Sequence, residues 1–244
     1  SVVNTLSPGD KVITVEGGKF GERWTEIAKA YGLTPVVLKV EWGTTCSADD
    51  IKKLLDANKD TKAVLIQACE TSTAVSYPIK EIAEVVSKTD AIFIVDGITG
   101  VGVDDIRFDE YKIDVLVSGS QKAFMLPPGL GFVCLSDKAW KMNETSKCPK
   151  YYFNLKNELK NHKKNTTAYT PAVSLVIGLK KALEIIKQAG LANWFKKNAV
   201  LAEATREAAK GMGLSVFAKM NPANAVTAIS LPEGIEGNKV PDIM

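Results

Sequence analysis

Two residues that could do chemistry follow apolar runs of the kind that form buried strands. Asp96 comes directly after the run AIFIV, and Lys122 comes shortly after the run DVLVSGS. A carboxylate buried at the end of a strand destabilises the fold unless a cation or hydrogen-bond donors lie beside it. The small residues at 118–120 let the backbone before the lysine approach a ligand closely. If the two strands are neighbours, the carboxylate and the amine face one crevice.

This pair of groups suits one cofactor, pyridoxal 5'-phosphate. The cofactor needs a lysine for its Schiff base and a carboxylate that keeps its ring nitrogen protonated, so that the ring can accept electrons from a substrate carbanion. Each residue also has a simpler interpretation, Asp96 as a turn former before Gly97 and Lys122 as a surface lysine after a strand. The combination, at two strand ends of one sheet, favours the functional interpretation.

The elements that must position these residues alternate along most of the chain. The predicted strands are 11–15, 34–40, 63–69, 91–96, 114–120 and 131–136, and the predicted helices are 20–32, 48–58, 79–89, 172–189 and 193–210. Strands that are apolar on both faces and separated by helices predict an α/β fold, with a mixed, mostly parallel sheet covered by helices on both faces. Such sheets bind ligands at the carboxyl ends of their strands.

The pattern changes near residues 187–190, after which short predicted strands lie at 214–218 and 225–231. We therefore predict a large domain over residues 1–187 and the start of a small α/β domain over residues 188–244. The chain has no initiator methionine and stops just after an apparent strand, which suggests that it is a fragment.

Composition excludes several classes of protein. Apolar residues make up 45% of the chain, and 31 basic and 28 acidic side chains give a net charge of only +3, so we expect no nucleic-acid partner. No apolar run approaches the ~20 residues that span a bilayer. The four cysteines form no CxxC pair and the chain has one histidine, His162, which excludes the common zinc patterns. A reducing cytoplasm fits this cysteine pattern.

The segment VDGITGVGVDDIRFDEYKIDVLVSGSQKAFMLPPGLGFVCLSDKA resembles the cofactor-binding core of class V, fold-type I aminotransferases. It is most similar to the alanine–glyoxylate/serine–pyruvate branch, and SGSQKA followed by PPG is its most discriminating part. Cysteine desulfurases of this class usually carry histidine before the lysine, where this chain has Gln121, and phosphoserine aminotransferases share the Gln-Lys pair in a different setting. The segments LSPGDKVITVEGGKFGERWTEIAKAYG and ETSTAVSYPIKEI extend the resemblance over essentially all 244 residues.

The resemblance implies roles for individual residues around pyridoxal phosphate. Lys122 corresponds to the Schiff-base lysine, Asp96 to the partner of the pyridine nitrogen, and Gln121 to a residue that contacts the phosphate. Thr71, in CETSTAV, lies where the family places a hydroxyl near the phenolic oxygen. Phe20, in GGKFGER, lies where an aromatic residue, often tryptophan, stacks on the ring; a core aromatic before a helix is the competing interpretation.

The resemblance also implies a homodimer. The segment TTAYTPAVS is similar to the one that reaches the partner subunit's phosphate in family dimers, and Thr170 is the candidate residue. The implied reaction moves an amino group from alanine or serine to a 2-oxo acid, glyoxylate or pyruvate.

Three parts of the family pattern have no counterpart here: the main phosphate-binding loop, the N-terminal arm and the small-domain arginine that binds the substrate carboxylate. Arg23, Arg107 and Arg206 do not match that arginine. A bidentate arginine contributes much of the orientation on which transamination depends. We therefore expect a parent protein that is an aminotransferase and a fragment that is inactive or nearly so on its own.

Three alternatives remain open from the sequence. A lyase or desulfurase on the same scaffold would need Cys46 or Cys148 as an acceptor thiol. A nucleotide-binding α/β domain would use EGGKFGE or GITGVG, although neither is GxGxxG after the first strand and neither has the Walker lysine-hydroxyl pair. The third alternative is a non-catalytic remnant whose remaining role is dimer formation.

Overall fold

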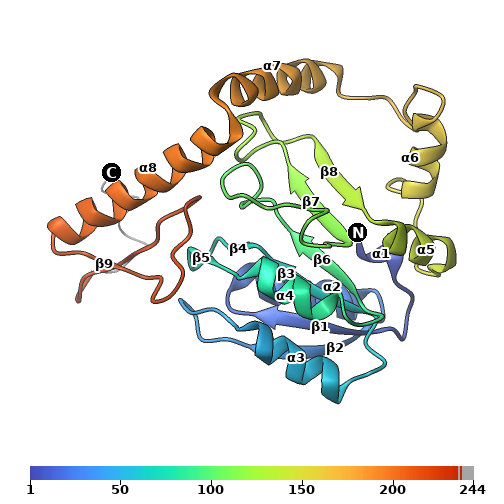
Figure 1. The fold of residues 1–244 in the computed structure, drawn as a ribbon, viewed down its shortest axis with the longest axis horizontal. Helices are drawn as coiled ribbons and strands as arrows, with labels where there is room; N and C mark the ends of the chain where they lie inside the picture. The colour runs from blue at the N-terminus through green and yellow to red at the C-terminus, as the bar shows by residue number, and fades with distance from the viewer. Residues whose placement is uncertain (236, 238–244) are drawn as a thin grey trace.

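Six strands form the central sheet in the order β2-β1-β3-β6-β7-β8 in the computed structural model, which describes residues 1–235 and 237 (Figure 1). The strands are β1 (Lys11–Glu16), β2 (Thr34–Lys39), β3 (Ala63–Gln67), β6 (Ile92–Asp96), β7 (Val115–Gly119) and β8 (Gly131–Leu135). The four pairings from β2 to β7 are parallel, and β8 runs antiparallel to β7. The predicted mixed, mostly parallel sheet is confirmed.

The register of the sheet brings the two candidate strand ends together. Asp96, the last residue of β6, pairs with Val117 of β7, two residues before that strand ends at Gly119. The turn that carries Lys122 therefore begins beside the carboxyl end of β6. Because β6 and β7 are parallel neighbours, both strands end at the same edge of the sheet.

Helices cover both faces of the sheet because alternate strand residues are apolar on both sides. On one face, α3 (Ala48–Ala57) and α4 (Ile79–Val86) pack on strand residues such as Val64, Ile66 and Phe93. On the other face, α1 (Val2–Thr5), α2 (Lys19–Ala30) and α5 (Asp137–Thr145) pack on residues such as Leu65 and Ile94. The sheet is thus the middle layer of three.

Helix α3 begins at a reciprocal capping pair formed by Ser47 and Asp50. The Ser47 hydroxyl accepts the backbone N–H of Asp50 at 3.2 Å, and the Asp50 carboxylate accepts the backbone N–H of Ser47 at 2.9 Å. These reciprocal bonds satisfy two donors that a helix start leaves without partners.

Replacing Ser47 with alanine should lower the free energy of unfolding by about 1 kcal/mol, because it leaves a first-turn N–H without its acceptor. Urea denaturation measures this change. Ser87→Ala, at an exposed hydroxyl after α4, is the matched control and should change stability by less than about 0.5 kcal/mol. Equal effects of the two variants would contradict the assignment of Ser47 as the cap.

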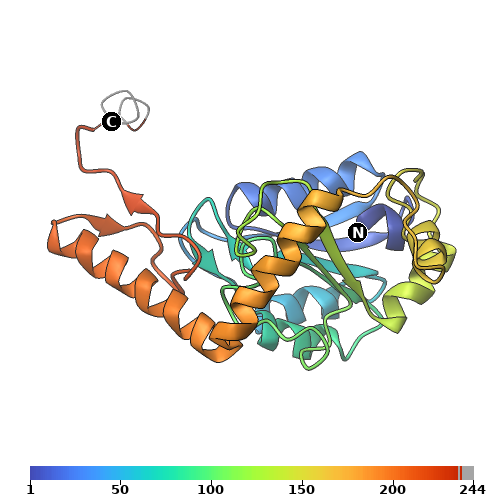
Figure 2. The same cartoon turned by 90° about the horizontal axis from the view of Figure 1, so that it is seen from above.

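The chain after the sheet forms α6 (Leu155–His162), α7 (Val173–Ala189) and α8 (Leu191–Gly211), with Gly190 at positive φ between the last two. Helix α8 leads away from the sheet toward β9 (Ser215–Val216), as Figure 2 shows from above. None of the helices in the described part of the chain has both the length and the apolar character needed to cross a membrane. The division at residues 187–188 stays a prediction, and residues 236 and 238–244 of the second part lie outside the described residues.

The two strands predicted after α8 are shorter than the sequence suggests. Instead of 214–218 and 225–231, the structure has β9 and β10 (Ile229–Ser230), which pair antiparallel over two residues each. The segment between them bonds back to the turn between β4 (Cys69–Glu70) and β5 (Val75–Ser76). Asn221 accepts the N–H of Ser76 at 2.8 Å, and Ala223 donates to Ala74 at 2.8 Å. These contacts attach the connection between the two strands to the β4–β5 segment.

Candidate active site

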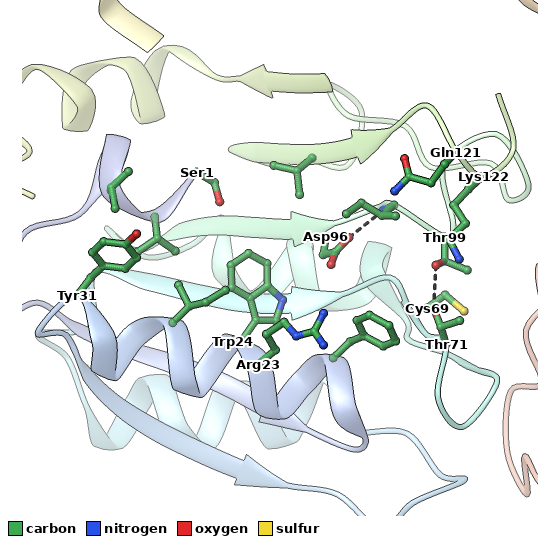
Figure 3. Close-up of a pocket in the computed structure, with 16 residues that line it drawn as sticks. Ser1, Arg23, Trp24, Tyr31, Cys69, Thr71, Asp96, Thr99, Gln121 and Lys122 are labelled. Atoms are coloured by element: carbon green, nitrogen blue, oxygen red, sulfur yellow. Dashed lines mark hydrogen bonds between the residues drawn. The ribbon is translucent and has the colours of Figure 1, made fainter. Parts of the chain in front are cut away.

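Asp96 closes β6 with its side chain in a cavity of about 510 Å³ at the carboxyl edge of the sheet (Figure 3). Its Oδ1 accepts the backbone N–H of Ile98 at 2.8 Å, which fixes the orientation of the carboxyl group. Burial raises the pKa of Asp96 above its ordinary value, against the lowering effect of the Ile98 hydrogen bond, and the charge of Glu70 raises it further. A cation in the cavity would relieve this unfavourable burial of charge.

Lys122 reaches the same cavity from the turn that follows β7. Ser120, which is fully buried, holds this turn: its hydroxyl donates to the Pro127 carbonyl at 2.7 Å and accepts the N–H of Leu130 at 3.2 Å. Gln121 also lines the cavity, and both it and Lys122 are exposed to solvent. The lysine side chain is therefore accessible, while its backbone is anchored by a buried hydroxyl.

One side of helix α2 forms the opposite wall of the cavity. Phe20, Arg23, Trp24, Ile27 and Tyr31 recur at helical spacing and all line it. The Arg23 guanidinium lies 5.1 Å from the centroid of the Phe20 ring, a cation–π distance. This wall is mostly apolar and aromatic, which suits a flat ring.

A pair of threonine hydroxyls lies at the end of the cavity near Lys122 in Figure 3. Thr71, between β4 and β5, shares a hydrogen bond of 2.7 Å with Thr99, which follows Asp96 in the chain. Because each hydroxyl can donate once and accept twice, one of the pair keeps a proton to donate into the cavity.

Five of the six residues proposed from the sequence line this single cavity: Phe20, Thr71, Asp96, Gln121 and Lys122. The sixth, Thr170, is exposed in the segment between α6 and α7 and is not among the lining residues of the described chain. Its role was predicted for a partner subunit, so it stays a prediction.

Sequence reasoning missed several lining residues. Arg23 and Trp24 could have been found by continuing the helical period from Phe20. Thr99 and Cys69 carried no signal, because their proximity to the site arises from the fold of two separate turns. Burial raises the pKa of Cys69 to about 12, so its thiol stays protonated at neutral pH.

The two thiols considered for a desulfurase lie elsewhere in the described chain, since neither Cys46 nor Cys148 lines the cavity. Both are buried, and burial raises the pKa of Cys46 to about 12. A reactive acceptor thiol requires the thiolate form in an accessible position. The surroundings of these two cysteines therefore do not favour that alternative.

Residues 1–242 match the family model described as aminotransferase class-V. A soluble hydrogenase 42 kDa subunit of Anabaena cylindrica is 41% identical over 247 residues, covering 100% of this chain and 64% of that protein. A serine–glyoxylate aminotransferase of Methylorubrum extorquens is 37% identical over 248 residues, covering 97% of this chain and 62% of that protein. The crystal structure of an alanine–glyoxylate aminotransferase from a Nostoc species superposes with a TM-score of 0.91 at 26% identity, covering 98% of this chain and 64% of that one.

The chain thus spans less than two thirds of the length of each of these relatives. The family match, by contrast, extends over almost all of the chain and includes the sheet, the cavity and the lysine turn. The chain belongs to the class V aminotransferase family.

Proposed function

We propose that the chain is part of a pyridoxal-phosphate-dependent aminotransferase that moves an amino group from alanine or serine to glyoxylate or pyruvate, and that the chain alone is inactive or nearly so. The observation that carries this proposal is that the buried carboxyl group of Asp96 and the accessible amine of Lys122 line one cavity. A carboxylate and a lysine amine are the two groups that the ring nitrogen and the aldehyde of this cofactor require. The cavity volume of about 510 Å³ lies within the range typical of cofactor sites.

The remaining lining residues also fit the cofactor. The apolar wall of α2 offers Phe20 as a face for the ring. The Thr71 hydroxyl, held by Thr99 at 2.7 Å, could donate to the phenolic oxygen. Gln121 would contact the phosphate. We propose that Thr170 reaches the cofactor phosphate of a partner subunit in a homodimer.

When bound, the cofactor supplies an electron sink for the carbanion that forms at the substrate Cα. Asp96 would hold the proton on the ring nitrogen, and its buried carboxylate would be stabilised by that cation. The Nζ of Lys122, displaced by the substrate amine, would take the proton from the substrate Cα and deliver it to the carbon that derives from the cofactor's aldehyde. The anchored backbone of the lysine turn would keep Nζ within reach.

The cytoplasm is the proposed location. Cys46, Cys69, Cys134 and Cys148 are all free thiols in the structure, which supports a reducing compartment.

Ligand titration followed by a donor screen, both on the longer parent protein expected from the sequence, tests the proposed function. Pyridoxal phosphate should bind with the visible absorption band of a lysine-bound aldehyde, whereas NAD and ATP at equal concentration should not compete. Alanine or serine, with glyoxylate or pyruvate, should then give the corresponding 2-oxo acid and amino acid. Binding of a nucleotide in place of pyridoxal phosphate would support the nucleotide-binding alternative instead.

A further inference from the structure

Glu70 is a fully buried carboxyl group that lies just behind the cavity wall. Its two oxygens are within hydrogen-bond distance of five donors. Oε1 accepts the backbone N–H of Phe20 at 3.3 Å and both the N–H and the hydroxyl of Ser72 at 3.2 and 2.5 Å. Oε2 accepts the N–H of Gly21 and the side-chain amide of Gln67, each at 2.9 Å. Every one of these contacts presents a donor to the carboxyl group, so it acts as an acceptor only.

The Glu70 carboxyl group caps the N-terminus of α2, a role that usually belongs to a residue next to the helix in the sequence. The residue at the N-cap position is Gly18, which has no side chain to accept the first-turn donors, and α2 has no side-chain cap of its own. Glu70 accepts two of those donors from a strand 49 and 50 positions along the chain. A negative charge at this end of a 12-residue helix is also favoured by the helix dipole.

Gly18 is explained by this close approach of Glu70, and Gly21 by the close approach of α2 to β1. A Cβ on Gly18 would lie 2.5 Å from the Glu70 carboxyl carbon, and one on Gly21 would lie 2.2 Å from the Val15 carbonyl oxygen and 3.0 Å from Gln67 Nε2. The motif EGGKFGE, which resembles a nucleotide loop in the sequence, therefore makes room for a side chain of the protein itself. The space in front of these glycines is filled by Glu70 and its neighbours.

Phe20 connects Glu70 with the cavity. Its backbone N–H is held by Glu70, while its ring lines the cavity. Thr71 lines the cavity too, immediately after Glu70 in the chain. The charge of Glu70 additionally raises the pKa of Asp96. Glu70 itself is not among the lining residues, so it acts on the site only through others.

We propose that Glu70 is a positioning residue that holds the Phe20 ring over the cofactor ring, and this inference rests on the proposed function. Its carboxylate fixes the start of α2 against the carboxyl edge of the sheet, so that the aromatic face is in place before the cofactor binds. Such preorganisation lowers the ordering cost of binding.

Glu70→Gln tests the proposal because it keeps the shape and replaces one acceptor oxygen with an NH₂ group that faces donors. We expect the dissociation constant for pyridoxal phosphate, measured by titration, to rise about 10- to 100-fold, as for loss of hydrogen bonds to a charged group. The visible circular dichroism of the bound cofactor should also weaken, since it reports the asymmetric contact with the ring. Glu22→Gln, at a carboxylate elsewhere on α2, is the matched control and should bind as the unaltered protein does.

A double-mutant cycle separates positioning from a general effect on folding. Phe20→Ala should weaken binding by itself, and adding Glu70→Gln in that background should change the dissociation constant less than about twofold, because coupled residues are not additive. Ser72→Ala, at an exposed position, removes one donor to Glu70 and the acceptor of the Lys19 N–H in the first turn of α2, and should weaken binding by a smaller factor than Glu70→Gln.

The outcomes distinguish this inference from the proposed function. If the unaltered protein does not bind pyridoxal phosphate, the proposed function fails and the role of Glu70 fails with it. If the unaltered protein binds and Glu70→Gln binds equally well with the same circular dichroism, the role of Glu70 alone is wrong. Full additivity with Phe20→Ala would likewise overturn it. If Glu70→Gln does not fold, unchanged binding by Ser72→Ala decides against the proposal.

Discussion

Replacing Lys122 with alanine in the longer parent protein is expected to lower aminotransferase turnover by about 10⁴-fold, the upper end of what a positioned proton-transfer group contributes. We expect the loss of turnover to reach this upper end because the same Nζ would both bind the cofactor and transfer the substrate proton. The side chain is exposed, and the turn that carries it is fixed by Ser120, so the fold should not change. Steady-state kinetics with the donor and acceptor found in the screen measure the effect.

Two further variants make the Lys122 result specific. Lys122→Arg keeps a positive charge in the cavity but offers no amine that can condense with an aldehyde, and it should be as inactive as Lys122→Ala. Lys141→Ala removes an exposed lysine on α5, away from the cavity, and should be fully active. Near-normal turnover by either Lys122 variant would show that another group carries the proton.

Asp96→Asn is expected to reduce turnover by about 10²- to 10⁴-fold, which corresponds to the about 3–5 kcal/mol that is lost when one partner of a buried ion pair is removed. Asparagine keeps the shape and can still accept the N–H of Ile98, so the loss reports the charge that would hold a proton on the ring nitrogen. Asp109→Asn, at an exposed carboxylate outside the cavity, is the matched control. Normal turnover by Asp96→Asn would contradict the assigned role.

The same variant should have the opposite effect on stability when no cofactor is added. Burial raises the pKa of Asp96, so the folded protein takes up a proton at a higher pH than the unfolded chain does. The ionised carboxylate therefore lowers the free energy of unfolding above the folded pKa, and this penalty fades as the pH falls toward the ordinary value of 3.8. Asp96→Asn should raise the urea midpoint at neutral pH, with a gain that shrinks at acidic pH. A gain that is independent of pH would show that the charge is not its cause.

The sheet and the principal pair of residues could be predicted because local patterns determine them. Five apolar residues before Asp96 and an apolar run before Lys122 identified β6 and β7, and parallel neighbours end at the same edge. The helix that contains Phe20 was likewise visible from its period and its glycine stop. The family resemblance then supplied the roles of Gln121 and Thr71, which spacing alone does not reveal.

Other features depend on contacts between segments that are far apart in the sequence, and local patterns do not reveal them. Glu70 looks in the sequence like one acidic residue among many, and its importance arises because α2 brings donors to it from 49 and 50 positions away. Helices α5 and α6 are short, at 9 and 8 residues, and consist mostly of polar residues, and they were not predicted. The strands after α8 were predicted too long, and no sequence pattern indicates that the segment between them bonds back to β4 and β5. The role of Thr170 toward a partner subunit stays a prediction.

Mapping the attachment point of the cofactor tests the central claim most directly. The protein is incubated with pyridoxal phosphate, the carbon–nitrogen bond to the lysine is fixed by borohydride reduction, and the labelled peptide is identified by mass spectrometry. We predict that the added mass lies on Lys122 and that the label is lost in Lys122→Ala. Labelling of a different lysine, or labelling that persists in Lys122→Ala, would contradict the assignment of this cavity as the cofactor site.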